Sequence, residues 1–200
     1  MYMTKNFSYF EMIKSSTADR LGVSNAPTTE HVINLVNLCN FILQPVREEF
    51  GPIRINSGYR SPTLNAKVGG SKTSQHCNGE AADFESSRIS NPNLAAWIAK
   101  NLDFDQLILE FYDGKDPNSG WIHCSYKKDG TNRGKTLTAL RIRGKTQYKN
   151  GNNHYNKPFF VPTMKTNSAK TRIKIPTFSK SMRTFRKDFT WKTICPMVSK

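Results

Sequence analysis

The chain has 200 residues, of which 36% are hydrophobic and 11% are aromatic. This composition can form a hydrophobic core and excludes a fully disordered chain, and the length suits one ordinary domain with an appendage or two small domains. No run of about 18 apolar residues occurs, so the sequence predicts no membrane-spanning helix. The first 15 residues also lack the apolar stretch of a secretory signal peptide, so we expect none.

The positive charge is concentrated near the C-terminal end of the sequence. The whole chain carries 30 Lys and Arg against 15 Asp and Glu, a net charge of +15. Residues 1–140 hold 15 basic and 14 acidic side chains, a net charge of +1, whereas residues 141–200 hold 15 basic side chains and one acid, a net charge of +14. The first 140 residues are therefore electrostatically ordinary.

The clearest predicted helix spans residues 28–50. Its apolar residues recur at three- and four-residue steps, and they are Val32, Leu35, Val36, Cys39, Ile42, Leu43 and Val46. Thr28 or Thr29 can cap its start and Gly51 ends it, while Pro45 is expected to kink it before its end. We interpret the apolar stripe as core and assign it no chemistry.

The rest of the patterned region predicts short strands with two further helices. The strands are expected at residues 53–56, 81–84, 107–111, 121–126 and 137–142, with a brief helix at 64–68 and a second helix that starts at Asn91 as its cap. An opening helix followed by strands that are joined mainly by loops favours an α+β fold with a largely antiparallel sheet.

The apolar pattern fades after Gly144. We therefore expect a domain at residues 1–144 and a weakly structured basic tail at residues 145–200. Basic residues mixed with aromatic ones can bind an anionic wall polymer, a lipid surface or nucleic acid, and the same composition fits a solvated appendage. Because the tail shows no nucleic-acid-binding motif, we regard nucleic acid as an unlikely partner.

Two histidines and one aspartate form a candidate metal site. His76 lies in a polar loop, Asp83 follows it by seven residues, and His123 lies in a predicted strand. Two imidazoles and one carboxylate are a good ligand set for a hydrolytic zinc ion, which keeps a further position for water. From spacing alone, two surface histidines or two core histidines would be the commoner interpretation.

Three ordered motifs raise the weight of the metal site. The segment from Ser74 to Asp83, SQHCNGEAAD, fits S-x-H-x-x-G-x-A-x-D, and SGYRSP at residues 57–62 precedes Asn65. These segments, together with WIH at residues 121–123, resemble the zinc D-Ala-D-Ala carboxypeptidase/dipeptidase family, which shares its fold with the Hedgehog signalling domain. The resemblance covers roughly residues 5–143, and the opening at residues 7–27 is similar to the phage and bacterial branch.

The resemblance implies roles for individual residues. His76, Asp83 and His123 would bind one zinc ion. Arg60 would be a fixed cation near the metal, suited to a substrate carboxylate or to a carbonyl oxygen that becomes anionic. Ser74 would hydrogen-bond within the ligand loop or contact substrate. Tyr59, beside Arg60, is a further candidate for substrate binding.

The general base is the assignment for which the sequence departs from the family. Many relatives place an acidic residue or a histidine a few positions before the last ligand, often three, and here that position is Gly120. Glu110 ends a predicted apolar strand and is our preferred base. Asp116 is the second candidate and Asp113 the third.

The resemblance predicts a zinc metallopeptidase that hydrolyses peptidoglycan stem peptides at a D-Ala-D-Ala or an L-Ala-D-Glu bond. The phage-like opening suggests a lytic or tail-associated enzyme, in the host cytoplasm or on a virion, that acts at the bacterial cell wall. Two alternatives stay open. One is a catalytically silent binding domain stapled by zinc, and the other is a basic protein that binds nucleic acid through its tail.

Overall fold

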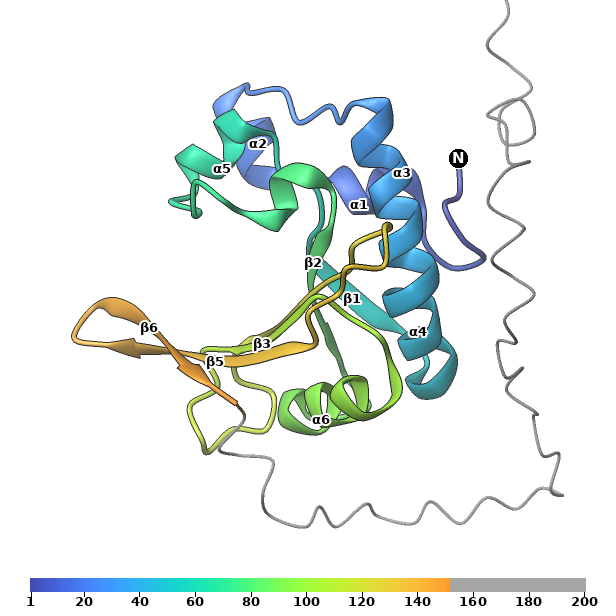
Figure 1. The fold of residues 1–200 in the computed structure, drawn as a ribbon. Helices are drawn as coiled ribbons and strands as arrows, with labels where there is room; N and C mark the ends of the chain where they lie inside the picture. The colour runs from blue at the N-terminus through green and yellow to red at the C-terminus, as the bar shows by residue number, and fades with distance from the viewer. Residues whose placement is uncertain (152–200) are drawn as a thin grey trace, which may run out of the picture. The chain divides into compact units, whose positions relative to one another are not determined.

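A six-stranded sheet organises the part of the chain that this computed structural model describes, residues 1–151 (Figure 1). The strands are β1 (Ile53–Ser57), β2 (Ala81–Ser86), β3 (Gln106–Glu110), β4 (Trp121–Ser125), β5 (Lys135–Ile142) and β6 (Lys145–Asn150). Their order across the sheet is β1-β2-β4-β3-β5-β6. The β3–β5 pair is parallel and the other pairs are antiparallel. The predicted α+β fold with a largely antiparallel sheet is confirmed.

The helix predicted at residues 28–50 is present as three consecutive segments. They are α3 (Thr29–Leu38), the π-helical turn η1 (Cys39–Leu43) and α4 (Gln44–Phe50). The Thr28 side chain caps the start and Gly51 ends the helix. Pro45 has no N–H to donate and its ring crowds the preceding turn, and the wider π turn immediately before it lets the helix continue.

The remaining helices are short, apart from α6. They are α1 (Tyr9–Ile13), α2 (Ser16–Leu21), α5 (Pro62–Lys67), the 3-10 turn η2 (Gln75–Asn78) and α6 (Asn91–Asn101). The sequence did not predict α1 and α2, since five and six residues are too few to show a helical period. Ser90, not Asn91, caps α6. Asn91 is instead buried, and its amide donates to the carbonyls of three residues in the β3–β4 loop.

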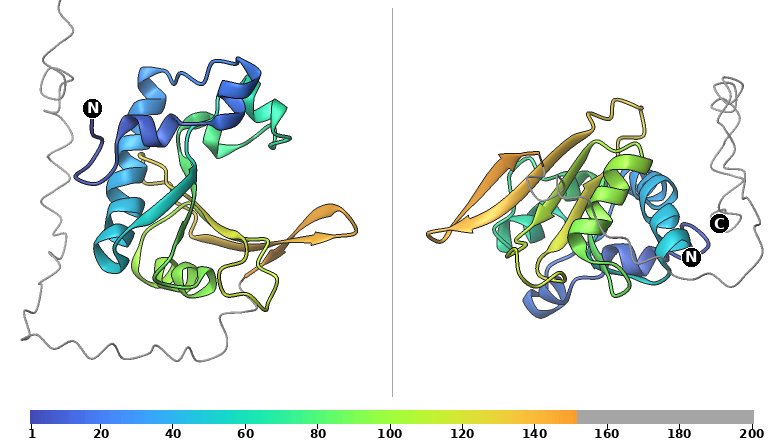
Figure 2. Two further views of the ribbon diagram at one scale, coloured as in Figure 1. Left: turned by 180° about the vertical axis from the view of Figure 1, so that it is seen from behind. Right: turned by 90° about the horizontal axis from the view of Figure 1, so that it is seen from below.

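The sheet separates a core face from a polar face. Along β2, β3 and β4 alternate residues are fully buried among the helices, namely Ala82, Phe84, Leu107, Leu109, Ile122 and Cys124. They pack with apolar residues of α3, η1 and α6, and Figures 1 and 2 show these helices covering one side of the sheet. Because successive strand residues point to opposite faces, Asp83, Ile108 and His123 lie on the other face.

The sheet extends past the domain boundary expected at residue 144. β6 pairs with β5 through a two-residue turn at Arg143 and Gly144, both of which have positive φ. Residues 145–150 are therefore part of the sheet and not of a weakly structured tail. The other expectations for the tail fall on residues 152–200, which lie outside the described residues. Among residues 1–151 no helix is both long and apolar enough to cross a membrane.

Candidate metal centre

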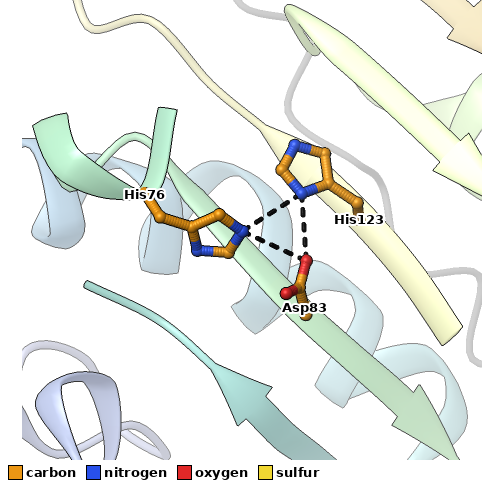
Figure 3. A group of neighbouring side chains, drawn as sticks. All are labelled: His76, Asp83 and His123. Carbon is orange, nitrogen blue, oxygen red and sulfur yellow. Dashed lines mark hydrogen bonds and ion pairs between the residues drawn. The ribbon is translucent and has the colours of Figure 1, made fainter. Parts of the chain in front are cut away.

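The pairing of β2 with β4 brings two of the predicted ligands together. Asp83 and His123 are directly opposite each other in the antiparallel ladder. The third ligand, His76, enters from η2, which precedes β2, and Figure 3 shows the three side chains pointing toward one another. All three residues are buried, with exposed fractions of 3 to 7%.

The spacing of the three donor atoms fits one tetrahedral metal ion. His76 Nε2 lies 3.2 Å from Asp83 Oδ1 and 3.2 Å from His123 Nδ1, and the last two atoms are 3.0 Å apart. Ligands that bind zinc at about 2.0–2.2 Å with tetrahedral angles are about 3.3–3.6 Å apart, within a few tenths of an ångström of the distances in this cluster. The cluster therefore matches a zinc site with three protein ligands, the type that leaves a coordination position open.

The tautomer of His76 is set by the backbone. Its Nδ1–H donates to the carbonyl of Gly58 at 2.7 Å. The lone pair of Nε2 is then directed at Asp83 and His123, where it faces a carboxylate and a second imidazole nitrogen. A cation would balance acceptor atoms that converge in this way. In addition, a carbonyl that accepts from the other ring nitrogen is the usual support of a metal-binding histidine.

A buried carboxylate outside the cluster holds the segment that carries His76. Asp105 is fully buried, and its Oδ2 accepts a hydrogen bond from Gln75 Nε2 at 2.7 Å. The same carboxylate accepts from Nε and Nη2 of Arg133 at 2.8 and 2.6 Å. Burial alone would raise the pKa of Asp105, but the bonds from Arg133 and Gln75 outweigh it and lower the pKa.

Arg60 supports the second ligand directly. Its Nη2 donates to Asp83 Oδ2 at 2.6 Å and its Nε donates to Ser57 Oγ at 2.8 Å. The register of β1 against β2 shifts between Ile55 and Ser57, as in a β-bulge. Arg60 is therefore a partner of a metal ligand, a contact that the motifs did not reveal.

Glu110 lies beside the cluster on the same face of the sheet. Glu110 is the last residue of β3 and is paired with Trp121, which precedes His123 by two residues on β4. Glu110 also lines the same cleft as the three ligands. Burial and the negative charge of Asp83 raise the pKa of Glu110, while His123, Arg60 and Trp121 partly offset them. The indole N–H of Trp121 is close enough to stabilise the ionised carboxylate of Glu110 and so to lower its pKa. It does not form a hydrogen bond of ordinary geometry.

The backbone explains why no acid stands three residues before His123. Gly120 has φ +70°, and a Cβ built there would overlap the carbonyl oxygen of Glu110. No side chain fits at this position. The acidic group next to the cluster comes from the neighbouring strand instead.

The other two candidate bases lie away from the cleft. Asp113 and Asp116 are in the exposed β3–β4 loop, where they accept backbone hydrogen bonds. Neither lines the cleft of about 1300 Å³ that contains the three ligands and Glu110. The geometry thus favours Glu110 among the three, and its role as a base stays a prediction.

The two remaining predicted site residues also line this cleft. Ser74 directly precedes η2, and its carbonyl accepts from the N–H of Cys77 at 3.1 Å. Tyr59 is 3% exposed and its ring packs against the ring of His31, with centroids 5.0 Å apart. Their contact with substrate stays a prediction.

The sequence analysis missed one wall of the cleft. Arg141, Thr146, Tyr148 and Asn150 line it from the β5–β6 hairpin, and the last three lie on β6, in the stretch that the sequence analysis assigns to the tail. β6 is exposed along its whole length, so it lacks the apolar alternation that reveals a strand.

Comparison with known proteins agrees with the site. The sequence matches the Peptidase M15 family over residues 5–125, which contain the three metal ligands. It is 32% identical over 116 residues to the zinc D-Ala-D-Ala carboxypeptidase of Streptomyces albus G, an alignment that covers 57% of this chain and 44% of that protein. The chain thus aligns with less than half of the length of this relative. Since the family match covers more than half of the 200 residues, the chain belongs to the Peptidase M15 family.

Proposed function

We propose that this protein is a zinc-dependent peptidase that hydrolyses stem peptides of the bacterial cell wall. One observation carries the proposal, namely that the ligand atoms of His76, Asp83 and His123 lie 3.0–3.2 Å apart in an open cleft that Glu110 also lines. The similarity to a zinc D-Ala-D-Ala carboxypeptidase supports the substrate class. The bond cleaved would be D-Ala-D-Ala or L-Ala-D-Glu.

In this mechanism the protein holds the ion and moves a proton. A zinc ion with an open position supplies an activated water and polarises a carbonyl at neutral pH. Glu110 accepts the proton of the attacking water and passes it to the leaving amine, a transfer that contributes about 10²–10⁴-fold. Arg60 holds Asp83 by one N–H and has further donors for a substrate carboxylate or for the developing oxyanion.

We extend the proposal to a phage-type lytic or tail-associated enzyme. The support is the resemblance of residues 7–27 to the phage and bacterial branch of the family. Such an enzyme would be made in the host cytoplasm or carried on a virion and would act at the cell wall.

Mass spectrometry of purified peptidoglycan fragments tests the substrate class. Incubation with the zinc-loaded protein is expected to release D-Ala or to produce a cut between L-Ala and D-Glu, and a chelator is expected to abolish either product. Absence of any chelator-sensitive product would contradict the proposed function and favour a silent binding domain.

A substitution at Glu110 distinguishes the hypothesis of a zinc peptidase from that of a catalytically silent zinc-binding domain. Glu110→Gln keeps the size of the side chain but removes the base, so we expect kcat to fall by about 10²–10⁴-fold with unchanged zinc content. Asp116→Asn is the matched control, because Asp116 lies outside the cleft, and it should leave kcat unchanged. Equal activity of the Glu110→Gln protein and the wild type would rule out Glu110 as the base.

A further inference from the structure

The β5–β6 hairpin adds a cationic wall to the cleft. It lies outside residues 5–125, over which the family match extends, and Figure 1 shows it projecting from the edge of the sheet. Residues 135–150 contain five Lys and Arg and no Asp or Glu. Lys135 and Arg141 are the two of these cations that line the cleft. A wall of this composition favours an anionic ligand.

Arg141 is held in place without an acidic partner. Its guanidinium carbon lies 5.2 Å from the centroid of the Phe111 ring, and that ring makes an edge contact with Trp121. Phe111 follows Glu110 directly and has φ +56°, a left-handed conformation that is uncommon for a bulky residue. Within residues 1–151 Arg141 forms no ion pair, so its five N–H donors are available to a ligand.

Tyr148 stands next to Arg141 on the same face of the hairpin. Tyr148 is opposite Ala139, and Ala139 is in turn aligned with Glu110 in the parallel β3–β5 pair. Tyr148 and Glu110 are thus two strands, or about 10 Å, apart at the backbone, and the small Ala139 between them leaves room for the phenol. Tyr148 is 58% exposed and lines the cleft.

The electrostatics of Tyr148 agree with this placement. Partial desolvation by the cleft and the negative charges of Glu110 and Asp83 raise the pKa of Tyr148, so its phenol keeps its proton and remains a hydrogen-bond donor. Arg141 and Tyr148 are diagonal neighbours on paired strands, about 7–8 Å apart, which is close enough for two long side chains to reach one ligand. Together they offer a charged fork and a neutral hydroxyl donor.

We propose that Arg141 and Tyr148 form a subsite that binds the free carboxylate of the D-glutamyl residue, beside an L-Ala-D-Glu scissile bond. The inference rests on the proposed function, and it identifies the preferred substrate as an acidic peptide. Arg141 would bind the carboxylate through two parallel N–H groups, and Tyr148 would donate a third hydrogen bond.

Two synthetic stem peptides that differ only in a carboxylate or a carboxamide on the D-glutamyl residue test the subsite. For the carboxylate peptide, Arg141→Gln is expected to lower kcat/KM by about 10- to 100-fold, as for the loss of a charged hydrogen bond, and Tyr148→Phe by a smaller factor. The carboxamide peptide should respond little to either change. Arg143→Gln is the matched control, since it removes the same charge from the turn of the hairpin, outside the cleft.

Two results would overturn the subsite. One is an equal effect of Arg141→Gln and Arg143→Gln on kcat/KM for the carboxylate peptide. The other is an equal loss of kcat/KM for the carboxylate and carboxamide peptides in the Arg141→Gln protein. Calorimetric binding of both peptides to zinc-loaded Glu110→Gln protein gives a readout that is independent of turnover. Tighter binding of the carboxylate peptide, lost in the added Arg141→Gln change, would support the subsite even if the wild type cleaved neither peptide. Cleavage without preference for the carboxylate would contradict the subsite and leave the proposed function standing.

Discussion

At the scale of single residues, hydrogen bonds with neighbouring groups fix how the candidate metal ligands are oriented. The carbonyl of Gly58 fixes which nitrogen of His76 faces the site, and Arg60 fixes the orientation of Asp83. Such outer contacts orient a ligand before the metal binds, and losing one usually weakens metal affinity by about 10- to 100-fold.

A conservative change at Arg60 tests this support. Lysine keeps the charge but cannot donate to Asp83 and Ser57 at the same time, so we expect Arg60→Lys to weaken zinc binding by about 10- to 100-fold. Competition with a chromophoric chelator measures the affinity. Arg54→Lys is the control, because Arg54 pairs with Glu85 on the exposed side of the same region. Unchanged zinc affinity with a reduced kcat would mean that Arg60 acts on substrate alone.

At the scale of secondary-structure elements, the β3–β4 connection brings Glu110 next to the ligands. Gly120 lies so close to Glu110 that a methyl group would displace one of the two strands. We expect Gly120→Ala to lower the free energy of unfolding by about 1–3 kcal/mol more than Gly114→Ala does. Gly114 is in the same loop with φ +81° but has open space around its Cβ position, so it isolates the cost of the backbone conformation. Denaturant unfolding of both variants measures the difference, and equal losses would refute the close contact.

The Asp105 contacts predict a pH-dependent stability. Because the pKa of Asp105 is lowered in the folded state, its contribution to stability is present above the unfolded pKa of about 3.9 and is lost as pH falls through the folded pKa. Asp105→Asn should therefore lower the unfolding free energy by about 1–3 kcal/mol at pH 6, and the difference should shrink below about pH 4. Asp103→Asn, at an exposed carboxylate nearby, should show no such difference. A gap between Asp105→Asn and wild type that is constant with pH in metal-free protein would contradict the assignment.

Elements with a clear period could be predicted from the sequence, and short or exposed ones could not. The apolar stripe at residues 28–50 predicted a long helix because most of its members face the core. The β5–β6 hairpin was missed because β6 is exposed on both faces and its turn uses Arg143 at positive φ, where Asn or Asp is the usual signal. The motifs located the ligands, but contacts such as that of Arg60 with Asp83 depend on strand register, which no local pattern encodes.

At the scale of the whole described molecule, one face of the sheet forms the hydrophobic core and the other face lines the candidate active-site cleft. One face packs against α3, η1 and α6, and the other carries the metal ligands, Glu110 and the wall formed by the hairpin. The opposite wall of the cleft comes from the segment of α1 and α2 and from the loop after α5, so the site joins parts of the chain that are far apart in sequence. The cleft has a volume of about 1300 Å³, which is larger than the pockets that bind drug-sized ligands. It therefore has room for an extended peptide.

Titration of zinc into metal-free protein, with hydrolysis of a stem peptide followed at each ratio, tests the account most directly. Activity is expected to rise in proportion to zinc and to reach a plateau at one ion per chain, whereas a His123→Ala protein should not regain it. Full hydrolysis by the metal-free protein, or an activity that zinc restores equally well without His123, would contradict the assignment of His76, Asp83 and His123 as the site of catalysis.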